Sequence, residues 1–82
     1  MVTIKYDAVF ERNIKKIKDG LLKLKVKKQI EKIVKSPEIG KPMKFGRKGT
    51  REVYIPPFRL SYSYIKEEDT IIFFELYHKD EQ

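Results

Sequence analysis

Three short segments near the C-terminal end constrain the fold most. Between residues 51 and 77, β-branched and aromatic residues alternate with polar ones, which is typical of half-buried strands. Pro56-Pro57 interrupts this pattern once, because proline cannot donate to a central ladder. The charged run Lys66–Asp69 interrupts it again. The pattern therefore predicts strands over residues 51–55, 58–65 and 70–77, folded back and forth as antiparallel neighbours.

The first 36 residues predict one further strand and two helices. Residues 2–6 are rich in β-branched side chains and indicate a strand. Asp7 suits a helix N-cap, and apolar residues follow it at spacings of three and four to about residue 18. A second run of this kind follows Asp19-Gly20 and ends at Ser36-Pro37. The apolar positions of the two runs are Phe10, Ile14, Ile17, Leu22, Val26, Ile30 and Ile33.

The order of these elements predicts the fold class. A strand, two helices and three strands (β-α-α-β-β-β) indicate an α+β domain, in which a helical hairpin packs on one face of a small, mainly antiparallel sheet. A chain of 82 residues holds one such domain, spanning residues 1–82. Residues 37–50, rich in Gly, Pro and Lys, are predicted to form a loop.

Alternation within the strands predicts which side chains face the helices, because successive side chains of a strand point to opposite faces. The core-facing set comprises Phe58, Leu60, Tyr62, Tyr64, Ile72, Phe74 and Leu76. The outward set comprises Arg59, Ser61, Ser63, Glu75 and Tyr77. The second face is therefore expected to be uncovered, with Arg59 near its middle.

The chain is basic, and its charge is unevenly distributed. Its formal net charge is +7 at pH 7. Residues 1–51 carry sixteen Lys or Arg against five Asp or Glu, whereas residues 52–82 carry three against seven. A basic region of this strength attracts phosphate backbones, so a nucleic acid is an expected partner. A lysine-rich, solvated surface would account for the same charge without one.

Two absences narrow the class of protein. The chain has no cysteine, which excludes a disulfide framework and thiolate metal sites and favours a reducing, cytoplasmic location. No apolar run approaches the length of a membrane span, so no membrane partner is expected.

The strand motifs resemble those of a known family. Phe58-Arg-Leu-Ser-Tyr62 is similar to the Tyr-Arg-Leu/Val-x-Tyr strand of the RelE/ParE toxin superfamily. The order and spacing of Ser36-Pro37, Arg51–Ile55 and the terminal His78–Glu81 also resemble that superfamily over nearly the whole chain. The resemblance implies the toxin of a type II toxin–antitoxin system, held inactive by a cognate antitoxin. RelE-like members cut messenger RNA on the ribosome, and ParE-like members poison DNA gyrase.

The resemblance favours a RelE-like, ribosome-dependent messenger-RNA endonuclease that inhibits translation without a cofactor. Cleavage without a metal needs a base for the ribose 2′-hydroxyl, a cation for the phosphate and an acid for the leaving oxygen. Arg59 is predicted to clamp the phosphate, because guanidinium offers two parallel donors. The predicted catalytic residues are Arg59, His78, Lys79 and Tyr77. The predicted RNA-binding residues are Lys44, Arg47, Lys48, Arg51 and Tyr54.

Several alternatives fit the same residues. Arg59 would also serve as half of a structural ion pair with Glu75 on the neighbouring strand. Tyr54 and Tyr77 would also serve as ordinary cross-strand packing. Glu52 and Tyr54 stand where the RelE-like branch carries lysines. A ParE-like gyrase inhibitor and a non-catalytic RNA- or ribosome-binding module therefore both remain alternatives.

Overall fold

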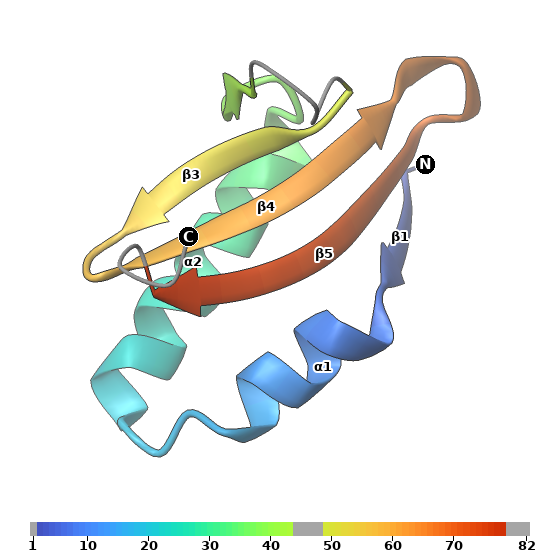
Figure 1. The fold of residues 1–82 in the computed structure, drawn as a ribbon. Helices are drawn as coiled ribbons and strands as arrows, with labels where there is room; N and C mark the ends of the chain where they lie inside the picture. Colours follow the sequence, from blue (N-terminus) through green and yellow to red (C-terminus); the bar gives the residue numbers. More distant parts are fainter. Residues whose placement is uncertain (1, 44–48, 79–82) are drawn as a thin grey trace.

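The computed structural model describes residues 2–43 and 49–78 of the 82-residue chain, and these form an α+β fold (Figure 1). The predicted order of strand, two helices and three strands is confirmed. The elements in chain order are β1 (Thr3–Tyr6), α1 (Ala8–Lys15), α2 (Gly20–Lys35), β2 (Lys41–Pro42), β3 (Arg51–Ile55), β4 (Phe58–Ile65), a 3-10 turn (Lys66–Glu68) and β5 (Thr70–His78).

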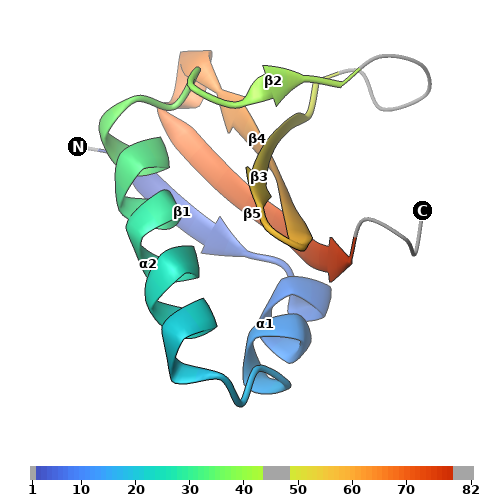
Figure 2. The ribbon, with the colours of Figure 1, turned by 90° about the vertical axis from the view of Figure 1, so that its left-hand side faces the viewer.

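The strands form one sheet in the order β1-β5-β4-β3-β2. The pairing of β1 with β5 is parallel, and every other neighbouring pair is antiparallel, so the sheet is mainly antiparallel as predicted. The two-residue strand β2 is an addition, because residues 37–50 were expected to form only a loop. Both helices lie on the same face of the sheet, and the opposite face is left uncovered by them (Figure 2).

Two aspartates fix where the helices begin. The carboxylate of Asp7 accepts a hydrogen bond from the Val9 backbone at 2.8 Å, and that of Asp19 accepts one from Leu21 at 2.9 Å. Each satisfies a backbone donor that the first helical turn leaves without a partner. The helix α1 ends at Lys15, three residues before the expected end, because the chain must turn before the Asp19 cap.

The core lies between the helices and one face of the sheet. Three aromatic rings join β1, α1 and β5: Tyr6 stacks on Phe10 with ring centroids 5.8 Å apart, and Phe10 stacks on Phe73 at 5.5 Å. Full burial of such a side chain contributes about 1.5–3 kcal/mol. The buried apolar set is Phe10, Ile17, Val26, Ile33, Ile55, Leu60, Tyr62, Ile71, Phe73 and Leu76.

A bulge in β5 overturns part of the predicted alternation. Ser61 pairs with Glu75 and Tyr62 pairs with Phe73, so Phe74 is an extra residue without a cross-strand partner. The β5 residues on the N-terminal side of the bulge therefore point to the face of the sheet opposite to the one predicted by strict alternation. The fully buried residues are Ile71 and Phe73, whereas Ile72 and Phe74, predicted to be in the core, are only partly buried.

The buried Tyr62 fixes the chain between α2 and β2. Its hydroxyl donates to the Pro37 carbonyl at 2.7 Å and accepts from the Gly40 amide at 2.8 Å. Burial raises the pKa of the Tyr62 phenol above its usual value. Arg51 reinforces the same turn, donating from Nη1 to the carbonyls of Glu38 at 3.0 Å and Gly40 at 2.8 Å. These bonds determine where the edge strand β2 begins.

Candidate functional site

Four side chains from three strands meet on the uncovered face. Register places Tyr54 of β3 opposite Arg59 of β4, and Arg59 opposite Tyr77 of β5. Glu52 shares this face with Tyr54, since residues two apart in a strand point the same way. Their strand neighbours Leu60 and Leu76 are buried in the core, so this set points away from the helices. Glu52, Tyr54, Arg59 and Tyr77 are called the open-face cluster below.

The carboxylate of Glu52 is the centre of the open-face cluster. Its Oε1 atom accepts from Arg59 Nη1 at 2.8 Å, and its Oε2 atom accepts from the Tyr77 hydroxyl. The Glu52 side chain is only 9% exposed, against 37% for Arg59. The alternative reading of Arg59 placed its ion-pair partner at Glu75, whereas the ion pair formed here is with Glu52.

The guanidinium of Arg59 is held but not fully satisfied. It lies over the ring of Tyr54, with Cζ 5.8 Å from the ring centroid, which is within the range of a cation–π contact. Its Nε atom is buried and has no hydrogen-bond acceptor among the residues that the structure describes. A buried donor without an acceptor costs about 1–3 kcal/mol. This donor of Arg59 is therefore left for an acceptor other than the described residues.

The predicted proton-transfer residue lies at the edge of this arrangement. His78 is the last residue of β5 and pairs with Phe58, whose ring it meets edge-on with centroids 5.5 Å apart. Phe58 packs against the core, so register places His78 on the helix side, opposite to Tyr77. The structure brings Arg59, Tyr77 and Tyr54 together but does not bring His78 to them.

The remaining predicted residues are placed as follows. Arg51 points to the helix side, where its guanidinium donates to two backbone carbonyls, so it is separated from the open-face cluster by the sheet. Four predicted residues lie outside the described part of the chain: Lys44, Arg47, Lys48 and Lys79.

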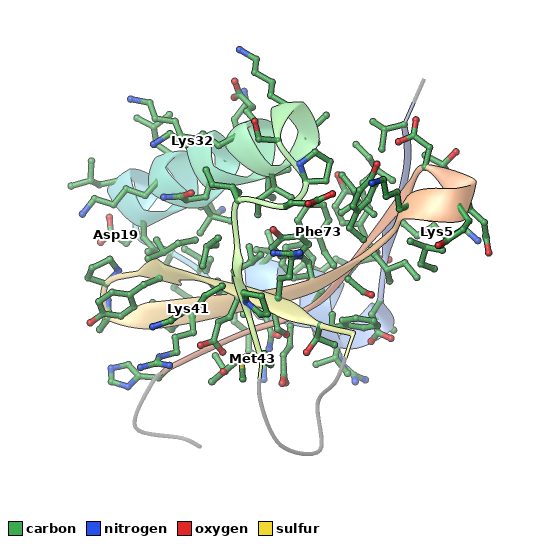
Figure 3. The ribbon with its side chains drawn as sticks, turned by 90° about the horizontal axis from the view of Figure 1, so that it is seen from above. Lys5, Asp19, Lys32, Lys41, Met43 and Phe73 are labelled. Atoms are coloured by element: carbon green, nitrogen blue, oxygen red, sulfur yellow. The ribbon has the colours of Figure 1, made fainter. Side chains whose placement is uncertain are left out.

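Sequence reasoning did not select Glu52 or Lys41 as site residues. Glu52 was noted only as a position at which RelE-like members carry lysine. Its position two residues before Tyr54 nevertheless places both side chains on one face of the sheet. Lys41 belongs to β2, which is too short to leave a strand pattern in the sequence. Register with β3 places it opposite Glu52. In Figure 3, Lys41 lies on the sheet, away from the helix that carries Lys32.

An apolar groove lies on the helix side of the molecule. Its volume is about 580 Å³, and it is lined by residues of α1 and α2 and by Tyr6 of β1. Its rim carries the lysines Lys15, Lys23 and Lys27 and the glutamates Glu11 and Glu31. Its apolar wall is formed by Phe10, Ile14, Ile17, Val26 and Ile30. The two helices therefore do not close on each other completely.

Two kinds of site are missing from the described residues. Within residues 2–43 and 49–78, no three His, Cys, Asp or Glu side chains gather in a way that would hold a metal ion. In the same ranges, no helix is both long and apolar enough to cross a membrane.

Comparison with known proteins identifies a family and a fold. The family model of the ParE toxin of type II toxin–antitoxin systems (parDE) matches residues 4–82. No curated protein matches the chain. The fold resembles that of solved structures of toxins and toxin–antitoxin complexes, although sequence identity is low.

Three of these structures illustrate the likeness. A chain of the intact E. coli RelBE toxin–antitoxin complex is 16% identical with a TM-score of 0.80, and the match covers 95% of this chain and 96% of that one. A chain of the Mycobacterium tuberculosis RelBE2 complex is 22% identical with a TM-score of 0.80, covering 95% and 98%. The YoeB/ParE toxin of Agrobacterium tumefaciens is 12% identical with a TM-score of 0.83, covering 94% and 98%.

Proposed function

The chain belongs to the ParE toxin family of type II toxin–antitoxin systems, within the RelE/ParE superfamily, and we propose that it is a ribosome-dependent messenger-RNA endonuclease that inhibits translation. The observation that carries this proposal is the open-face cluster, in which a carboxylate and a guanidinium lie 2.8 Å apart on an uncovered sheet. A proton acceptor next to a phosphate-binding cation is what metal-free RNA cleavage needs.

In the proposed reaction, Arg59 binds the scissile phosphate through its planar donors and stabilises the charge that grows on it. Turning to the phosphate separates Arg59 from Glu52, whose carboxylate then accepts the proton of the ribose 2′-hydroxyl. The 2′ oxygen attacks phosphorus and the bond to the 5′ oxygen breaks. The products are a 2′,3′-cyclic phosphate and a 5′-hydroxyl end.

The leaving 5′ oxygen needs a proton, and His78 is the proposed donor. Its ring packs against Phe58 at the end of β5, so it must swing round the strand end to reach the substrate. Tyr77 holds the second carboxylate oxygen of Glu52, and Tyr54 offers an exposed ring on which a base can stack. Such stacking contributes about 1–3 kcal/mol per base.

Primer extension on messenger RNA after induced expression tests this proposal. We expect cuts at a fixed position within codons, only in translated regions, and a cyclic phosphate at the new 3′ ends. The Arg59→Ala variant is the control, because it keeps the same charged surface elsewhere. Induction that stops growth without any new messenger-RNA ends would refute the endonuclease proposal.

A gyrase inhibitor is the second candidate, and two observations favour it. The matching family model is that of the ParE toxin. In addition, Arg59 is already neutralised by Glu52, and His78 lies on the other face of the sheet. Purified protein added to a gyrase supercoiling assay distinguishes the two functions, because an endonuclease leaves supercoiling unchanged.

The solved toxin–antitoxin complexes that share the fold support a cognate antitoxin as a partner of this protein. We propose that part of this antitoxin is an amphipathic, acidic helix lying in the groove between α1 and α2. The groove has an apolar wall for the helix's apolar stripe. The rim lysines Lys15, Lys23 and Lys27 outnumber the rim glutamates and favour acidic flanks on the partner.

A further inference from the structure

The ion pair between Arg59 and Glu52 raises a problem for any phosphate that approaches the open face. Arg59 Nη1 is engaged by Glu52, and Arg59 cannot turn fully to a phosphate while it keeps this bond. The Glu52 side chain is only 9% exposed, so water compensates its charge poorly once Arg59 has left. A second cation beside Glu52 would compensate this charge.

Register places that cation at Lys41. Lys41 of β2 pairs directly with Glu52 of β3 in an antiparallel ladder, so their side chains share the uncovered face. The Cβ atoms of such a pair lie about 4.5–5.5 Å apart, within reach of a lysine side chain. Lys41 is exposed, and no ion pair joins it to another residue in the described ranges.

The surrounding fold holds Lys41 in this position. One residue before it, the Gly40 amide donates to Tyr62 and the Gly40 carbonyl accepts from Arg51. Both partners belong to the sheet, so the start of β2 is attached to β3 and β4 by side-chain bonds as well as by the ladder. A two-residue strand would otherwise fray. The backbone at Lys41 is thereby kept next to Glu52.

The charge pattern gives a second reason. Lys41, Glu52, Ser61 and Glu75 form one row across four strands by register. Within this row Lys41 carries a positive charge directly beside Glu52, so it reduces the repulsion between the Glu52 carboxylate and an approaching phosphate. When Arg59 turns to the phosphate, the Glu52 carboxylate can pair with Lys41 instead.

We infer that Lys41 is a positioning residue of the proposed endonuclease site: it takes over the Glu52 carboxylate when Arg59 turns to the RNA phosphate. This inference rests on the proposed function. A lysine that only attracts the RNA phosphate would act whether or not Glu52 is charged. The role inferred for Lys41 instead requires the negative charge of Glu52. An effect of this kind disappears when Glu52 is neutral.

The test uses ribosomes carrying a messenger RNA that is 2′-O-methylated at the codon in the A site, so that binding is measured without cleavage. Dissociation constants are compared for the wild type and for Lys41→Ala, Lys41→Arg, Glu52→Gln and the Lys41→Ala/Glu52→Gln double variant. Lys5→Ala is the matched control, because Lys5 is an exposed strand lysine at the opposite edge of the sheet. Circular dichroism confirms that each variant is folded.

We expect Lys41→Ala to weaken binding by at least about tenfold and Lys41→Arg to restore it. Lys5→Ala should weaken it by less than about threefold, the effect of a distant exposed charge. In the Glu52→Gln background, Lys41→Ala should do no more than Lys5→Ala does.

Two results overturn the inference while leaving the proposed function intact. One is an equal effect of Lys41→Ala and Lys5→Ala. The other is an undiminished loss in the Glu52→Gln background, which would mean that Lys41 contacts RNA directly. A wild-type protein that does not bind the programmed ribosomes overturns the proposed function, and the inference with it.

Discussion

Arg59 and Glu52 meet across neighbouring strands, with Nη1 of Arg59 2.8 Å from Oε1 of Glu52, and Glu52 is the more buried of the two. The cation that would bind a substrate phosphate is therefore already paired within the protein. Removing either side chain leaves the charge of the other uncompensated. Substitutions of the two residues should therefore have different effects on RNA binding and on cleavage.

Replacing Arg59 by alanine should abolish toxicity without unfolding the protein. The Arg59 side chain is 37% exposed and is not part of the buried apolar core. Its loss should lower stability, because Glu52 loses its cation, but Glu52 keeps the Tyr77 hydroxyl as a donor and the core is unchanged. Loss of the phosphate-binding cation should slow cleavage by about 100- to 1,000-fold. Growth after induction, cleavage on ribosomes and a thermal melt measure the three quantities. A fully toxic, folded Arg59→Ala protein would rule out the open-face cluster as the site.

Glu52→Gln separates the proposed base from the proposed clamp. Glutamine keeps the shape and can still accept from Arg59, but it cannot take a proton from the 2′-hydroxyl. Cleavage should fall by about 100-fold or more. Binding of the uncleavable ribosome complex should stay equal or become tighter, because Arg59 is released from a charged partner. Parallel loss of binding and cleavage would instead show that Glu52 only organises the cluster.

His78→Ala should slow cleavage and leave binding nearly unchanged, if His78 protonates the leaving oxygen. Loss of a general acid typically costs about 10²- to 10⁴-fold in rate. A substrate with a 5′-thio leaving group is the control, because a thiolate leaves without protonation. The His78→Ala defect should vanish on that substrate. A defect of the same size on both substrates would assign His78 to packing against Phe58.

Gly40→Ala should destabilise the protein, because a Cβ there would meet the Tyr62 hydroxyl at 2.5 Å and its ring at 2.7 Å. Overpacking of this kind typically costs about 1–3 kcal/mol. Gly20→Ala is the matched control: it lies in α2, and nothing lies within 4 Å of the added Cβ. That change should stabilise by about 0.4–1 kcal/mol. Urea unfolding of both variants checks the opposite signs, and two equal shifts would contradict the role given to Tyr62.

Charge reversal on α2 should weaken antitoxin binding only where it faces the groove. Lys27 lines the groove and its neighbour Lys28 does not, yet both are exposed lysines on the same helix. Lys27→Glu should weaken the complex with the cognate antitoxin by about tenfold, and Lys28→Glu much less. Titration calorimetry with the purified antitoxin measures both constants. Equal losses would place the antitoxin helix elsewhere.

Much of the fold was predictable because its signals are local. Each aspartate cap lies within a few residues of the apolar positions, spaced by three and four, that indicate its helix. The alternation in β4 likewise lies next to the break at Pro56-Pro57. The bulge at Phe74 was not predictable in this way. Ile71, Ile72, Phe73 and Phe74 are all apolar, so alternation cannot reveal where the register shifts. Only pairing with β4 decides it.

The site was predictable in part for the same reason. Strand alternation placed Arg59 and Tyr77 on one face from the sequence alone. The Glu52 carboxylate accepts from Arg59 through one oxygen and from the Tyr77 hydroxyl, on the far side of β4, through the other. That relationship joins residues 25 positions apart and leaves no pattern in the chain.

The parallel pairing of β1 with β5 has a consequence for synthesis of the protein. Thr3 pairs with Thr70, and Tyr6 pairs with Phe73. The strand β1 therefore has no partner until β5, which follows all the other strands in the chain, has been synthesised. Contacts of such long sequence separation form late in folding. A chain that stops before Thr70 therefore has no strand with which β1 can pair. Such a chain also lacks Tyr77, whose hydroxyl donates to the Glu52 carboxylate, so the open-face cluster is incomplete in it.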